Sequence, residues 1–326
     1  MSKPWTPLEF VNYSLRPNKN IERKLIVELL LAMARQFPIR EYRYVGFGGL
    51  WYVDFVLFHK ALLISDMVSI ERADPERAEF NRPFSCVTVR GGNASDVIRE
   101  VGLDEKPALL WLDYEDSVNG PGFQDAAYAA ETAADGSVLL VTINSNQDVL
   151  RRMVKHSDGQ IRSLEEALRS CAPHLVPTPL DSRILSSQSS FEGLVGDMLL
   201  TSMIDAARQA GREETFRPLL NFAYRDGAPM VTAGGVLLGP DNRKRLQKCQ
   251  LDRLPWLCQP GSSQYRIAAP LLTAKEKGTL DRLLPAAGKL TDADLFERTS
   301  LKLKQSFIDE YAKVYRHYPQ FAELFR

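Results

Sequence analysis

A short glycine-rich segment, Gly46-Phe47-Gly48-Gly49, follows an apolar run and could bring the backbone close to a ligand. Glycine has no Cβ, so a chain that contains it can turn sharply and approach a bound group. A turn of this kind at the end of a parallel strand lies where α/β proteins hold ligands. The segment therefore predicts a binding turn, and a tight strand-to-helix turn without a ligand is the alternative.

Two charged residues follow the next apolar run at a spacing that suits nucleotide binding. Glu71 lies 25 residues after Gly46, and Arg72 comes directly after it. A carboxylate at about this spacing accepts hydrogen bonds from the hydroxyls of a ribose. Glu71 and Arg72 are therefore candidate cofactor-binding residues, and a solvated Glu beside an Arg is the simpler alternative.

Polar residues also follow the third and fourth apolar runs. Asn93 could lie beside an adenine, although the Ser95-Asp96 that follows also suits a helix start. Asp113 could act as a general base or orient an acceptor nucleophile, and Tyr114 could stack on the acceptor. A loop of solvated acids is the alternative for the acidic residues that follow.

Five apolar runs separated by helical segments must position these residues. The runs are Glu41–Val45, Ala61–Ile70, Cys86–Val89, Pro107–Leu112 and Ser137–Ile143. Strands that read as continuous apolar runs are typical of a parallel sheet with both faces covered. An Asp-Gly turn between the apolar runs 216–224 and 229–238 then indicates a hairpin. The predicted fold is α/β, a doubly wound and mostly parallel sheet that ends in an antiparallel hairpin, with an α-rich C-terminal appendage.

An amphipathic helix is predicted before the sheet, from Asn20 to Gln36. Its apolar residues recur at helical spacing, and its charged residues are expected to form the polar side. Those charged residues are Glu22, Arg23, Lys24, Glu28 and Arg35.

The order of these features resembles the class I S-adenosylmethionine-dependent methyltransferases over roughly residues 20–240. The segments 15–19, 22–23, 44–55 and 69–72 are similar to bacterial proteins labelled O-methyltransferases. The resemblance implies S-adenosylmethionine as the cofactor, held by Gly46, Gly48 and Glu71, with Asp113 near the transferred methyl group. The acid that usually precedes the glycines is replaced here by Tyr44-Val45.

The candidate site follows from these motifs and the resemblance together. The cofactor-binding candidates are Gly46, Phe47, Gly48, Gly49, Glu71, Arg72, Asn93 and Asp113. The catalytic candidates are Asp113 and Tyr114, and no metal site is expected, because the four histidines are far apart in the sequence.

Composition limits the partners and the compartment. The chain has 41 Lys and Arg residues against 41 Asp and Glu, so its net charge argues against a surface built for nucleic acid or anionic lipid. A basic run at residues 243–248 leaves nucleic acid as a less favoured partner. Four scattered cysteines and the lack of a long apolar segment are typical of a cytoplasmic protein with free thiols and no membrane span.

Two functions are compatible with these patterns. The first is methyl transfer, by O-methylation of an unidentified acceptor. The second is a catalytically silent methyltransferase-like scaffold or sensor that binds a partner protein or a nucleotide. We expect residues 1–240 to form the methyltransferase-like domain with its N-terminal helix. Residues 241–326 are expected to form a mainly helical accessory domain that could contact a protein partner or a second copy of the chain.

Overall fold

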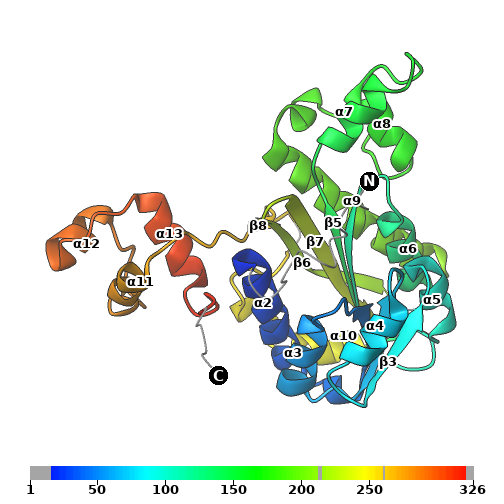
Figure 1. The fold of residues 1–326 in the computed structure, drawn as a ribbon, viewed down its shortest axis with the longest axis horizontal. Coiled ribbons are helices and arrows are strands. Elements are labelled where there is room, and N and C mark those ends of the chain that lie inside the picture. Colours follow the sequence, from blue (N-terminus) through cyan, green and yellow to red (C-terminus); the bar gives the residue numbers. More distant parts are fainter. Residues whose placement is uncertain (1–15, 212–214, 260, 321–326) are drawn as a thin grey trace.

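The structure is a computed structural model that describes residues 16–211, 215–259 and 261–320 (Figure 1). Its centre is a sheet in the strand order β3-β2-β1-β4-β5-β7-β6-β8. The strands are β1 Arg43–Phe47, β2 Asp66–Glu71, β3 Val87–Gly91, β4 Ala108–Ser117, β5 Val138–Asn144, β6 Thr215–Arg225, β7 Pro229–Leu238 and β8 Tyr265–Arg266. Strand β7 runs antiparallel to both of its neighbours, β5 and β6, and the other pairs are parallel. The predicted fold class is confirmed.

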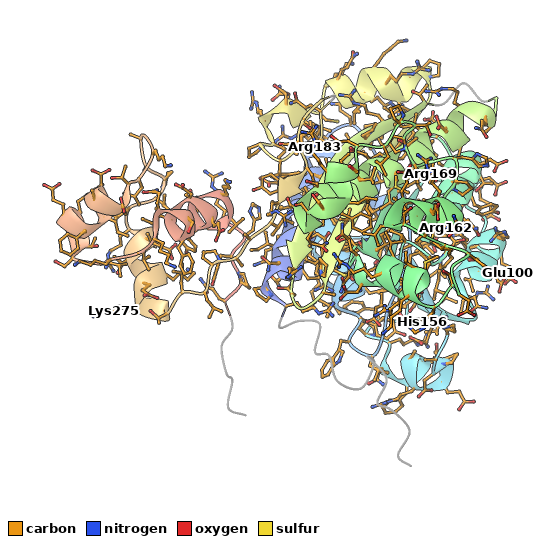
Figure 2. All side chains as sticks on the ribbon, turned by 90° about the horizontal axis from the view of Figure 1, so that it is seen from above. Glu100, His156, Arg162, Arg169, Arg183 and Lys275 are labelled. Carbon is orange, nitrogen blue, oxygen red and sulfur yellow. The ribbon has the colours of Figure 1, made fainter. Side chains whose placement is uncertain are left out.

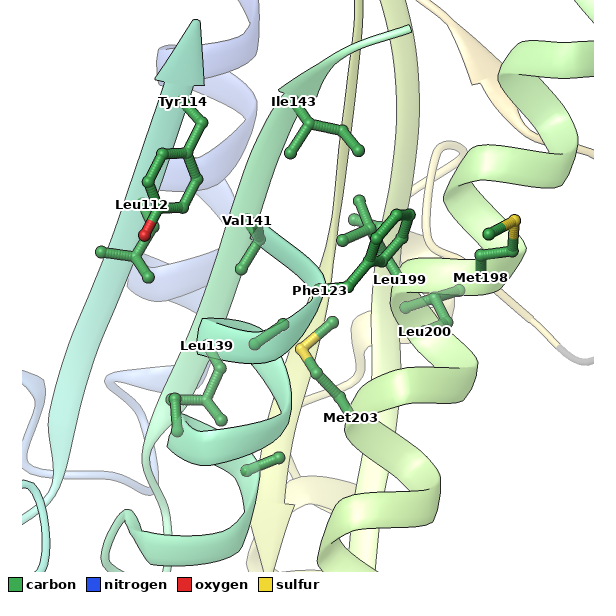
Figure 3. Close-up of a cluster of buried hydrophobic side chains, with 14 of the residues drawn as sticks. Leu112, Tyr114, Phe123, Leu139, Val141, Ile143, Met198, Leu199, Leu200 and Met203 are labelled. Atoms are coloured by element: carbon green, nitrogen blue, oxygen red, sulfur yellow. The ribbon is translucent and has the colours of Figure 1, made fainter. Parts of the chain in front are cut away.

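Helices cover both faces of this sheet (Figure 1). They are α2 Pro17–Met33, α3 Val53–Leu62, α4 Pro75–Asn81, α5 Ala94–Glu100, α6 Gly122–Thr132, α7 Asp148–Lys155, α8 Leu164–Cys171, α9 Gln188–Gln209, α10 Pro240–Gln247, α11 Ala274–Asp281, α12 Asp292–Thr299 and α13 Gln305–Val314. One apolar core joins the sheet to α5, α6 and α9, and a second joins it to α2 and α3. Figure 3 shows part of the first core, which contains Phe123 of α6, Leu199 and Met203 of α9, and Leu139 and Val141 of β5.

Strand β4 continues past the point where the apolar run ends. The run 107–112 predicts a turn at Asp113, but the strand extends to Ser117, and Asp113 pairs in register with Thr142 of β5. This expectation was wrong because Asp113 finds a buried cation, Lys19, inside the fold. Asp113 is therefore held by the ladder of the sheet and not by a loop.

The first described helix begins earlier than its apolar pattern predicts. Helix α2 starts at Pro17, and proline suits this position because its missing N–H would have no intrahelical partner. The expectation that Glu22 and Arg23 face solvent was also wrong, since they are 0% and 3% exposed. Helix α3 starts at Val53, after Tyr52 in a left-handed conformation.

A segment between β5 and α9 carries α7 and α8 beyond the carboxyl end of β5 (Figure 1). Figure 2 shows the labelled Arg162, Arg169 and Arg183 of this segment on the face turned to the viewer. Arg169 pairs with Glu165, and Arg183 pairs with Asp181. The segment is therefore a mixed-charge surface, with basic and acidic side chains side by side.

The C-terminal part first packs against the sheet and then forms a separate apolar core. Strand β8 pairs with β6, and Trp256 and Ile267 belong to the core beside α2. A third cluster joins α11, α12 and α13, which lie to one side of the sheet (Figure 1). Its buried members are Leu280, Leu290, Leu295, Ile308 and Tyr311. The division into residues 1–240 and 241–326 stays a prediction.

Within the described ranges, no helix is both long enough and apolar enough to cross a membrane.

Candidate active site

The parallel strands carry the sequence-predicted residues to one edge of the sheet. Strand β1 lies between β2 and β4, with Gly46 opposite Ser69 on one side and Trp111 on the other. The turn after β1, Glu71 at the end of β2 and Asp113 in β4 therefore belong to three adjacent strands. Ligands of doubly wound folds bind at this carboxyl edge.

Gly46, which lies inside β1, and Gly48, which follows the strand, are required by the protein's own packing. A Cβ on Gly46 would lie 2.5 Å from the Tyr44 hydroxyl oxygen, and a Cβ on Gly48 would lie 2.4 Å from Ser69 Oγ. Gly49 has a φ of 52° and open space around its Cβ position. The outer side of the turn is therefore open at Gly49, while Gly46 and Gly48 let the chain fit against β1, β2 and β4.

Glu71 is held at the end of β2 with one oxygen already bonded. Its Oε1 accepts a hydrogen bond of 2.8 Å from the Ala73 N–H and a longer one of 3.4 Å from the Asp74 N–H. The residue is 6% exposed, whereas the adjacent Arg72 is exposed. Because both of these bonds use Oε1, the other carboxylate oxygen is left to accept from a ligand hydroxyl, which is what a ribose requires.

Asn93 is the N-cap residue of α5 and makes no side-chain cap bond. It is exposed, and its side-chain amide donates to Asp96 Oδ2 at 3.4 Å. Ser95 is already inside the helix and donates to Asp125 Oδ2 of α6 at 2.8 Å. Asn93 is therefore accessible at the carboxyl edge after β3, and its contact with an adenine stays a prediction.

Asp113 and Tyr114 point to opposite faces of β4, as alternation along a strand requires. The Tyr114 hydroxyl donates to Asp125 Oδ2, and its ring packs edge-on against Phe47 with centroids 5.2 Å apart. Burial and this bond raise the pKa of Tyr114. Tyr114 faces the core beside α6 (Figure 3), and its role in stacking on the acceptor stays a prediction.

Asp113 instead faces a buried ionic cluster that the sequence patterns did not reveal. Lys19 Nζ lies 2.9 Å from Asp113 Oδ1 and 2.8 Å from Glu22 Oε2. The same ammonium lies 4.3 Å from the ring centroid of Trp111 and 5.4 Å from that of Tyr224, so cation–π attraction adds to the ion pairs. The Lys19 and Glu22 side chains are 0% exposed, whereas that of Asp113 is 18% exposed.

A pKa shift and a second ion pair complete the electrostatics of this cluster. Burial raises the pKa of Glu22, although the Lys19 ammonium opposes that shift. Arg23 forms a separate ion pair with Asp54 in the first turn of α3. Both buried cations of α2 are therefore matched by carboxylates.

The spacing of Lys19, Glu22 and Arg23 contained a signal for this cluster. These residues share a helix face with Ile26 and Leu30, which are fully buried. Charged residues on an apolar stripe are expected either to lie at its margin or to be paired inside. Only their partners, Asp113 in β4 and Asp54 in α3, decide which of these holds.

No three His, Cys, Asp or Glu side chains in the described part of the chain form a group that could hold a metal ion.

The sheet order, the terminal antiparallel hairpin and the carboxyl-edge residues define a Rossmann-like methyltransferase fold. A family described as "Putative O-methyltransferase" matches residues 11–325, and the chain belongs to this family. The resemblance inferred from the motifs is therefore confirmed, and the family and the fold support S-adenosylmethionine as the cofactor. The family match gives no support to the alternative of a catalytically silent scaffold.

Several solved structures are similar in fold. The O-methyltransferase TomG from Streptomyces achromogenes, in complex with S-adenosylmethionine, is 18% identical with a TM-score of 0.35, over 66% of this chain and 79% of that one. Trm1 from Pyrococcus horikoshii, with S-adenosylmethionine, is 14% identical with a TM-score of 0.47, over 76% and 60%. An O-methyltransferase from Bacillus cereus, in complex with S-adenosylhomocysteine, is 14% identical with a TM-score of 0.33, over 66% and 80%.

Identities and TM-scores at this level assign no role to individual residues of this chain. No curated protein matches the sequence significantly.

Proposed function

We propose that this protein transfers a methyl group from S-adenosylmethionine to an oxygen of a small-molecule acceptor at the carboxyl edge of β1, β2 and β4. The observation that carries the proposal is the position of Glu71 and Asp113 on the two strands that flank β1 and its glycine-rich end at residues 46–49. The family supports the reaction class. Bound S-adenosylmethionine would supply an electrophilic methyl group on a sulfonium, which reacts by in-line displacement once the acceptor is positioned.

The residues at the edge fit such a cofactor by their chemistry. The free oxygen of Glu71 suits the ribose hydroxyls, and the open side of the turn at Gly49 offers backbone close to the ligand. Phe47 and Asn93 would border the adenosine, and the guanidinium of Arg72 lies next to Glu71 along the chain. The position usually taken by an acid before the glycines holds Tyr44, which is 1% exposed and stacks edge-on against Phe55 and Phe58.

Asp113 would orient the acceptor. Its carboxylate is partly exposed, and it is fixed by a strand and an ion pair and not by a mobile loop. Fixed orientation matters because most of the rate advantage in methyl transfer comes from holding the acceptor oxygen in line with the methyl group. Tyr114 would contribute to the site by packing against Phe47.

Titration calorimetry with S-adenosylmethionine and S-adenosylhomocysteine tests the cofactor site. We expect the protein to bind both at about micromolar dissociation constants. Glu71→Gln keeps an oxygen for the Ala73 and Asp74 amides but replaces an acceptor by an NH₂ group, so affinity should fall roughly tenfold with little change in melting temperature.

The matched control is Glu76→Gln, an exposed position in the first turn of α4. It should bind like the unaltered protein. Equal affinity in Glu71→Gln would remove the ribose assignment, and the absence of binding by the unaltered protein would remove the proposed function.

A further inference from the structure

Lys19 carries a fully buried ammonium next to the candidate site. An ammonium loses its hydration when it is buried, and replacing a buried ion pair by apolar residues is often neutral or stabilising. Lys19 is nevertheless 0% exposed, and it lies in the first turn of α2, beside the carboxyl edge of the sheet. Stability alone therefore does not account for a buried ammonium at this position.

Contacts on several sides hold the Lys19 ammonium in place. Glu22 and Asp113 bind it through one oxygen each, and the Trp111 ring lies beneath it. Trp111 is itself held, because its indole N–H donates to Thr142 Oγ1 at 3.0 Å. Lys19 consequently has little freedom to move, and it transmits that restraint to Asp113.

The two carboxylates on Lys19 differ in access. Glu22 is fully buried, so no acceptor can reach it, whereas the Asp113 side chain is 18% exposed. The ion pair uses Oδ1 of Asp113, which leaves Oδ2 for a group at the edge of the sheet. An acceptor in this site therefore meets one oxygen of an oriented carboxylate.

We infer that Lys19 is a positioning residue for the acceptor: it holds Oδ1 of Asp113 so that Oδ2 accepts a hydrogen bond from a neutral hydroxyl. This inference rests on the proposed methyl transfer. As the acceptor oxygen bonds to the methyl carbon, the carbon–sulfur bond of the donor breaks. The hydroxyl proton then passes to Oδ2 of Asp113 and from there to water.

The charge balance selects hydroxyl acceptors over carboxylate acceptors. Lys19 is shared between two carboxylates, and Arg23 is paired with Asp54. No buried cation of α2 is left to bind an acceptor carboxylate, which would in addition be repelled by Asp113. The products are therefore methyl ethers and not methyl esters.

The linkage in the product tests the acceptor class. The full chain is incubated with S-adenosylmethionine labelled in its methyl group and a low-molecular-mass cell extract, and the products are treated with mild alkali. Methyl ethers survive this treatment, whereas methyl esters release methanol. Label that stays on the product is expected, and label released as methanol would overturn the inference. No label transfer at all would instead refute the proposed function, together with everything that rests on it.

Variants test the positioning role itself. Lys19→Met alone leaves two buried carboxylates without a cation, so the double variant Lys19→Met/Glu22→Gln is used, which removes a buried charge of each sign. We expect kcat to fall about a hundredfold while the affinity for S-adenosylmethionine in calorimetry stays the same. The single variant Lys19→Arg keeps a cation at this position, so its kcat should lie between that of the unaltered protein and that of the double variant.

The matched control is Lys24→Met/Glu28→Gln on the same helix, where Lys24 donates to the carbonyl of His317 and Glu28 pairs with its ring. It should keep kcat. An unchanged kcat in the Lys19→Met/Glu22→Gln variant, or a loss of kcat accompanied by an equal loss of cofactor affinity, would overturn the positioning role.

Discussion

Asp226 accepts a hydrogen bond of 2.8 Å from the backbone N–H of Lys19, a residue 207 positions away in the sequence. Its other carboxylate oxygen accepts from the backbone N–H of Asn18 at 3.1 Å and from the Asn18 side-chain amide at 2.9 Å. Arg16, at the N-cap position of α2, makes no side-chain cap bond. The turn between β6 and β7 therefore caps this helix and sets the position of Lys19 against Asp113.

Removing this cap should destabilise the protein. Asp226→Ala leaves the N–H groups of Asn18 and Lys19 without their acceptor, and loss of a helix cap or a charged hydrogen bond costs about 1–3 kcal/mol. Urea unfolding measures the difference. As a control, Asp241→Ala removes an exposed carboxylate paired with Lys244, and it should change stability by less than about 0.5 kcal/mol. Similar losses in both variants would contradict the capping role.

Glu22 should make stability fall as pH rises. Burial raises the pKa of Glu22 above 4.5, so the folded protein binds this proton more tightly than the unfolded chain does. The stabilising contribution is full below pH 4.5 and is lost as pH rises through the folded-state pKa. The free energy of unfolding, taken relative to Glu22→Gln, should therefore decrease as denaturant unfolding is repeated from pH 4 upwards.

The control for this pH dependence is Glu276→Gln, where the opposite sign is expected. The backbone and side-chain hydrogen bonds from Thr273 lower the pKa of Glu276. Stability relative to that variant should therefore be present above pH 4.5 and be lost as pH falls. A pH-independent difference for Glu22→Gln would show that its raised pKa does not act on folding.

Two glycines should respond to alanine in opposite directions. In Gly48→Ala the new Cβ would lie 2.4 Å from Ser69 Oγ and 2.5 Å from the Tyr52 ring, so we expect a loss of about 1–3 kcal/mol. Gly193 lies inside α9 with nothing within 4 Å of its Cβ position, so Gly193→Ala should gain about 0.5–1 kcal/mol. Thermal unfolding compares the two. A gain in Gly48→Ala would mean that the turn has more room than the packing indicates.

The sheet was predictable because burial on both faces leaves a simple pattern. Strands β4 and β5 read as continuous apolar runs, and the Asp-Gly turn at residues 226–227 signals the hairpin between β6 and β7. The Thr-x-x-Glu pattern at residues 273–276 is likewise typical of a helix start, and it forms a capping box in α11. Boundaries were less certain where a polar residue continues an element, as Asp113 does in β4.

The arrival of Glu71 and Asp113 at one edge of the sheet followed from the chain order, although Asp113 lies inside β4 and not in a turn after it. Parallel strands joined by helices carry their carboxyl ends to the same edge, so residues at these ends come together whatever separates them in the sequence. The hydrogen bond from Tyr114 to Asp125 could not be predicted from the strand pattern, because Asp125 belongs to α6. Alternation along a strand separates Asp113 from Tyr114, but it does not show what each one meets.

The sequence by itself determined the layered α/β architecture, the glycine-rich end of β1 and the acids at the carboxyl edge, because these depend on local periodicity and on where each apolar run ends. Only the tertiary structure decided that Lys19 and Glu22 are buried and that Lys19 pairs with Asp113 as well as with Glu22. Helical periodicity shows which residues share a face, but the groups that cover the face come from β4 and β6, far away in the chain. A buried charge is tolerated only when such partners surround it, and only the folded chain brings these partners together.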